Sequence, residues 1–138
     1  MPNWYTKMSI KTLLWVVAEI AIIFILLSLP GSTFQEQARW YGDFPIDKLV
    51  HICLFGSLAF SFFFHFEKSK YKQLKTVRAK AYTLLFCIVY GIGMEYYQKY
   101  FVPTRGFEVS DMLADAVGAL LALPTFNWIK TKLSISSN

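Results

Sequence analysis

The chain has little charge. Only 17% of its 138 residues are Asp, Glu, Lys or Arg, whereas globular domains average about 25%. Apolar residues take their place and make up 55% of the sequence, with aromatic residues at 18%. This composition argues against a water-soluble domain and favours a membrane protein. The length suits one domain, so residues 1–138 are treated as a single unit.

Cysteine is scarce and nucleophile motifs are missing. In a helical reading, Cys53 and Cys87 differ in membrane depth by roughly 12 Å. A disulfide requires Cα atoms within about 7 Å, so these residues are expected to be free thiols that pack as small hydrophobes. Ser110 lies beside several acids, but nothing marks it as an activated nucleophile. The acids and histidines match no recognised metal-binding spacing.

The apolar residues form four long blocks, each close to the roughly 17–25 residues that a transmembrane helix needs. None shows the alternation of a barrel strand. The blocks predict an all-α polytopic membrane protein with four transmembrane helices at about residues 12–30, 48–66, 80–101 and 109–129. The first block exceeds the usual signal-peptide core of about 7–15 residues and contains Glu19, which indicates a retained helix.

The net charge of +5 is unevenly distributed. Six of the fourteen Lys and Arg residues lie in the connector 67–80. By the positive-inside rule this basic loop is cytoplasmic, which places both termini in the cytoplasm as well. The loop is expected to contact anionic membrane lipids, and we expect no nucleic-acid partner.

Polar residues gather at the opposite ends of the helices. With the predicted topology, the start of the second span, the end of the third and the start of the fourth all lie on the outer side. These three stretches deliver Asp47, Lys48, His51, Glu95, Gln98, Arg105, Glu108, Asp111 and Asp115. Three distant segments therefore bring polar groups to one face of the membrane.

Helical spacing indicates that the acids point into the bundle. Asp47 and His51 are four residues apart and share a helix face. Asp111, Asp115 and Gly118 also share a face, and stripes that continue into small residues usually contact neighbouring helices. Glu95 and Asp115 lie about two turns inside their spans. An ionisable group at that depth is a functional-site hypothesis by default.

These residues suggest specific roles. In an enzymatic version, His51 is the acid or base, oriented by Asp47, while Glu95, Asp111 and Asp115 share protons or hold a cation. The candidate substrate-binding positions are Arg105, Gln98, Lys48 and Asp115, although a lysine at this depth also commonly reaches lipid headgroups. A divalent cation is the one cofactor that such oxygen-rich ligands suggest.

Three motifs carry a family resemblance. The segments "DKLVH", "GIGMEYYQ" and "PTRGFEVSDMLADAVGALLA" resemble the VanZ-like family of small bacterial membrane proteins, whose namesake is linked to teicoplanin resistance. The resemblance covers about residues 40–123. It includes Asp47, Lys48, His51, Glu95, Gln98, Arg105, Asp111 and Gly118. One departure is Asp115, which stands where the family usually has asparagine and adds a negative charge.

The resemblance implies a location in the bacterial cytoplasmic membrane and a role at the outer cell surface that lowers glycopeptide binding. It implies no reaction, and the sequence leaves open whether the chain is an enzyme. The leading hypothesis is an outward-facing pocket that binds or acts on a cell-envelope or lipid-linked molecule, such as a cell-wall precursor.

Two other classes stay open. The chain could be a non-enzymatic scaffold or accessory subunit, or a small ion-coupled transporter in which Glu19 and Glu95 mark a path. No inverted repeat supports transport, and a homo-oligomer is compatible with all three hypotheses. The first helix is expected mainly to pack against the others.

Overall fold

The computed structural model describes residues 4–32, 46–69 and 75–136, and these ranges contain helices joined by turns, without any strand. The helices are α1 (Trp4–Leu27), α3 (Ile46–Lys68), α4 (Val77–Phe101) and α5 (Val109–Ser136). Within this part of the chain, four helices are long and apolar enough to cross a membrane. The predicted all-α architecture with four spans is therefore confirmed.

The helix bounds differ from the predicted ones at several ends. Helix α1 begins at Trp4 rather than near residue 12, and α5 continues to Ser136 rather than ending near 129. The prediction followed the apolar blocks alone, whereas these helices extend beyond them into polar sequence. Helix α1 ends at Leu27 instead of continuing to Pro30, since a proline ring disfavours helical backbone in the preceding residue.

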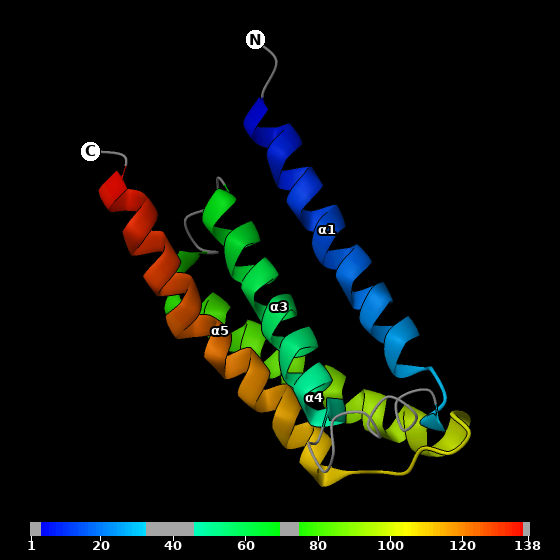
Figure 1. Cartoon of the computed structure of the whole chain (residues 1–138). Coiled ribbons are helices and arrows are strands. Elements are labelled where there is room, and N and C mark those ends of the chain that lie inside the picture. Colours follow the sequence, from blue (N-terminus) through cyan, green and yellow to red (C-terminus); the bar gives the residue numbers. More distant parts are fainter. Residues whose placement is uncertain (1–3, 33–45, 70–74, 137–138) are drawn as a thin grey trace.

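Helices α3 and α5 form the central pair. They pack more closely than any other pair in the described ranges, while α1 contacts chiefly α3. Figure 1 shows that α3 and α5 run in the same direction, with α1 and α4 running the opposite way. The N-terminal ends of α3 and α5 therefore meet the C-terminal ends of α1 and α4 at one end of the bundle.

Glycine permits the close approach of α3 and α5. A Cβ atom added at Gly118 would overlap the backbone carbonyl oxygen of Ile52 and lie 2.9 Å from its Cα. One added at Gly56 would lie 3.1 Å from the carbonyl oxygen of Gly118. Small residues are common where membrane helices approach this closely. This crossing fixes the spacing of the side chains that α3 and α5 present to each other.

The interior beyond this crossing is apolar. Phe63 and Phe126 pack edge to face with ring centroids 5.8 Å apart, and the ring centroids of Phe55 and Tyr90 lie 5.7 Å apart. Outward-facing positions of every helix carry large exposed apolar side chains, such as Trp15 of α1. Apolar residues on both the inside and the outside suit a helix bundle surrounded by lipid.

The helix arrangement agrees with an even number of crossings. The start of α1 and the end of α5 lie at the same end of the bundle, opposite the start of α3 (Figure 1). Residues 33–45, and residues 70–74 of the basic loop, lie outside the described ranges. Which end faces the cytoplasm stays a prediction from the charge distribution.

Candidate functional site

The polar residues converge at the end of the bundle where α3 and α5 begin. Helix α3 supplies three of them, α4 two, α5 two, and the α4–α5 loop two. We call this set the polar cluster; it comprises Asp47, Lys48, His51, Glu95, Gln98, Arg105, Glu108, Asp111 and Asp115.

His51 lies at the centre of the cluster and is completely buried. Its Nδ1 is 2.8 Å from Oδ1 of Asp115, which is also buried. A carboxylate accepts hydrogen bonds, so Nδ1 carries the proton and donates to Asp115. The prediction that Asp47 orients His51 is therefore wrong, because Asp115 of α5 fixes the tautomer. The other oxygen of Asp115 packs where Gly91 of α4 leaves room for it.

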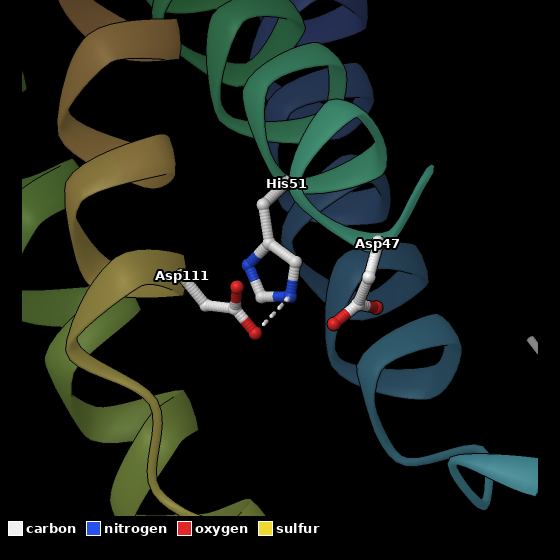
Figure 2. Close-up of side chains that lie close together, drawn as sticks. All are labelled: Asp47, His51 and Asp111. Carbon is white, nitrogen blue, oxygen red and sulfur yellow. Dashed lines mark ion pairs between the residues drawn. The ribbon is translucent and has the colours of Figure 1, made fainter. Parts of the chain in front are cut away.

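The second nitrogen of His51 faces two more carboxylates. Its Nε2 lies 3.8 Å from Oδ2 of Asp111, a distance too long for a hydrogen bond. One ligand atom from each of Asp47, His51 and Asp111 falls within 4.8 Å of the other two. Figure 2 shows the imidazole ring lying between the two carboxylates. Among the described residues, Nε2 has no hydrogen-bond partner.

Lys48 bridges two acids at the mouth of the cluster. Its Nζ lies 2.9 Å from Oδ1 of Asp111 and 3.1 Å from Oε2 of Glu108. Lys48 thus forms ion pairs within the cluster, while about a third of its side chain stays exposed at the mouth. The sequence places Glu108 among the polar groups at this end but predicts no site role for it. Its position three residues before Asp111, on the same side of the helix start, is the signal that could have assigned one.

Arg105 of the α4–α5 loop pairs with Asp47. Its Nη2 is 3.5 Å from Oδ1 of Asp47, and only 7% of its side chain is exposed. The preceding Thr104 has a φ of 64°, which is unusual for a β-branched residue. A Cβ atom at Gly31, just after α1, would lie 2.9 Å from the Thr104 carbonyl oxygen. The chain beyond α1 thus supports the loop that presents Arg105.

Glu95 and Gln98 connect the cluster to the surrounding helices. Oε2 of Glu95 accepts a hydrogen bond of 2.9 Å from the backbone N–H of Glu108, at the start of α5. The amide nitrogen of Gln98 donates to the carbonyl oxygen of Leu27 at 3.0 Å. Both side chains are buried. Each therefore uses a polar atom to hold helix ends together, and Gln98 is turned toward α1.

Glu19 of α1 hydrogen-bonds to Ser57 of α3, well along the bundle from His51. It does not bond to Glu95 or Asp115. That α1 mainly packs stays a prediction, and α1 also accepts the Gln98 hydrogen bond at Leu27. Beside Glu19, a groove of about 710 Å³ runs between α1, α3 and α5. Ile52 and Cys53 of α3 line it, next to His51 in the sequence.

The charges of the cluster do not balance. Within the described ranges it contains five carboxylates, from Asp47, Glu95, Glu108, Asp111 and Asp115, against the permanent cations Lys48 and Arg105. Charge buried away from water must be paired, protonated or bound to a cation. The cluster can thus hold a cation deep inside, with Lys48 partly exposed at its mouth and the Arg105 side chain largely buried beside Asp47.

Comparison with known proteins gives one family. No curated protein and no solved structure matches the chain. The model of the VanZ/LLP1 family matches residues 4–130, which include the first three helical spans, nearly all of the fourth and the whole polar cluster. The chain therefore belongs to the VanZ/LLP1 family.

Proposed function

We propose that this protein binds the anionic headgroup of a lipid-linked cell-envelope molecule at the outer face of the bacterial cytoplasmic membrane. The observation that carries the proposal is the polar cluster itself, which three segments build at one end of a membrane bundle. Lys48 and Arg105 are the groups that meet the headgroup, because they alone among the described cluster residues carry a permanent positive charge. Arginine suits this role through its planar, bidentate fork.

The groove between α1, α3 and α5 supports an amphipathic ligand rather than a free anion. Along α3 it is lined from Ile52 and Cys53 to Phe60 and Ser61, and most of its lining is apolar. A hydrocarbon chain in this groove would accompany a headgroup at the cluster. The Glu19–Ser57 hydrogen bond is one polar contact on the groove wall.

The competing classes receive less support. A continuous transport path would connect Glu19 to the cluster, whereas the Glu19 hydrogen bond goes to Ser57. A scaffold role accounts for Glu95 and Gln98, whose contacts join helix ends. It does not account for the excess of five carboxylates over the two permanent cations of the cluster. A role in lowering teicoplanin susceptibility, as the family resemblance implies, is compatible with binding of an envelope precursor.

The proposed orientation predicts opposite accessibility of the two loops. In a Cys53→Ala, Cys87→Ala background, we expect Gly106→Cys to react with a membrane-impermeant maleimide in intact cells. Gly106 suits this test because open space surrounds the added side chain. Gln73→Cys, in the basic loop, should react only after permeabilisation. The reverse pattern would place the cluster in the cytoplasm and overturn the proposal.

Arg105→Lys tests the headgroup role. The variant keeps the charge but loses the bidentate fork, and a hydrogen bond to a charged group contributes about 1.5–3 kcal/mol. We expect teicoplanin susceptibility of a host expressing the variant to return to that of the empty host. Thermal unfolding in detergent should stay within a few degrees of the parent protein.

Arg78→Lys is the matched control, because Arg78 is exposed near the start of α4, far from the cluster. It should leave both readouts unchanged. Unchanged susceptibility with Arg105→Lys, in a host that the parent protein does protect, would contradict the proposed function.

A further inference from the structure

We propose that His51, Asp111 and Asp47 bind one divalent transition-metal ion, Mn²⁺ or Zn²⁺, inside the polar cluster. The ligand atoms are Nε2 of His51, Oδ2 of Asp111 and a carboxylate oxygen of Asp47. This inference deepens the proposed function and rests on it only for the role of the ion in headgroup binding. Ion binding itself is tested separately.

The first argument is the lone pair of His51. Nδ1 donates its proton to Asp115, so in neutral imidazole Nε2 carries an unshared electron pair. His51 is completely buried, and a carboxylate oxygen of Asp111 lies 3.8 Å from Nε2. Two electron-rich atoms this close, with no hydrogen between them, repel. A cation between them removes the repulsion and gives Nε2 its missing partner.

The second argument is distance. Metal–ligand bonds to nitrogen and oxygen are about 2.0–2.2 Å, so two ligands of one ion lie at most about 4.4 Å apart. The separation of 3.8 Å between His51 and Asp111 falls inside that limit. The whole set spans up to 4.8 Å, so a small rotation of Asp47 completes it. Asp47 can rotate because its side chain is 32% exposed.

The third argument is the support around the ligands. Metal-binding histidines usually donate their other N–H to a carboxylate, which fixes the ring and makes it a better ligand. Asp115 does this for His51 at 2.8 Å. Lys48 holds the second oxygen of Asp111 at 2.9 Å and leaves Oδ2 turned toward the imidazole. Each buried ligand is thus held in place by a residue outside the ligand set.

The ligand chemistry selects the kind of ion. Carboxylates alone would suit Ca²⁺ or Mg²⁺, but an imidazole nitrogen favours Mn²⁺, Zn²⁺ and their neighbours. Three protein ligands leave coordination positions open. These positions face the mouth, where Asp47 and Lys48 are partly exposed. A phosphate or carboxylate oxygen of the headgroup can occupy one of them, with Lys48 and Arg105 beside it.

The alternative to a metal ion is a proton on Nε2 of His51, which would make His51 an imidazolium paired with Asp111 and Asp115. The two states differ in a measurable way. Tag-free protein in detergent is first stripped of metal with a chelator. It should then bind one Mn²⁺ per chain, measured by the loss of the free-ion electron paramagnetic resonance signal. Zn²⁺ should compete for this site, whereas Ca²⁺ and Mg²⁺ should compete poorly. The bound ion should show coupling to a ligand nitrogen.

Three variants distinguish metal coordination from a general effect of negative charge on ion affinity. Asp47→Asn should weaken Mn²⁺ binding at least about tenfold, and His51→Gln should abolish the nitrogen coupling. Glu108→Gln removes an equal charge from an exposed acid of the same cluster that lies outside the ligand set, so it should change affinity by less than about twofold.

Failure to bind Mn²⁺ or Zn²⁺ would overturn the inference, as would equal weakening by Asp47→Asn and Glu108→Gln. Neither result bears on the Arg105→Lys outcome. Loss of protection by Arg105→Lys in a metal-free protein would leave the proposed function standing without the ion.

Discussion

Replacing Asp115 with alanine should destabilise the protein by about 3 kcal/mol. The change removes the 2.8 Å acceptor of a completely buried imidazole N–H. An unsatisfied buried polar group costs about 1–3 kcal/mol, and the lost carboxylate also leaves a void against Gly91. Denaturation in mixed micelles, compared with the parent protein, measures the effect.

Asp115→Asn is the informative companion variant. Its amide oxygen can still accept the hydrogen bond from His51, so it should retain most of the stability. This result would also explain how asparagine suits the position in relatives, as the family resemblance implies. If Asp115→Asn destabilised the protein as much as Asp115→Ala, the His51–Asp115 pair would depend on charge, and His51 would be an imidazolium. Val117→Ala, on an exposed face of α5, reports the cost of a change outside the cluster.

The second large effect is expected at Gly118. Even Gly118→Ala places a methyl group against the backbone of Ile52, which cannot rotate away as a side chain can. Helices α3 and α5 must separate, and overpacking of this kind typically costs about 1–3 kcal/mol. We expect a loss near the upper end of that range. Mn²⁺ affinity should fall too, because Ile52 adjoins His51 and the crossing sets the distance to Asp111.

Gly93→Ala is the matched control for that variant. Gly93 lies in α4 with nothing within 4 Å of an added Cβ atom. Exchanging glycine for alanine inside a helix then stabilises by roughly 0.5–1 kcal/mol. Opposite signs for the two substitutions would identify the close crossing as the cause. Equal melting temperatures for Gly118→Ala and Gly93→Ala would contradict it.

The helices were predictable because length and hydropathy suffice to identify a membrane span. The convergence of acids at one end also followed from the sequence, since alternating helix directions determine which ends meet. The partner of His51 did not follow. Asp47 shares a helix with His51 and was the nearest candidate by spacing, whereas Asp115 reaches it from another helix. Sequence spacing describes one helix face but not which two faces meet.

The close contact between α3 and α5 could not be predicted from the sequence either. Consecutive helices of a short-looped bundle are antiparallel, so sequence order favours α4 as the main neighbour of α3. The structure instead pairs α3 with α5, which runs parallel to it. Gly56 and Gly118 allow this contact. Each glycine is visible in the sequence, but only their mutual approach shows that they form one crossing.

The pairing of α3 with α5 has a consequence for biosynthesis. Translation produces α3 and α4 before α5, so His51 and Glu95 enter the membrane before Asp115 and the Glu108 amide exist to satisfy them. Unpaired polar groups in hydrocarbon are costly, and the nascent helices must remain near water or near the insertion machinery until α5 arrives. The same polar groups then hold the last helix in the bundle. Ribosomal timing is thus part of how this site is assembled.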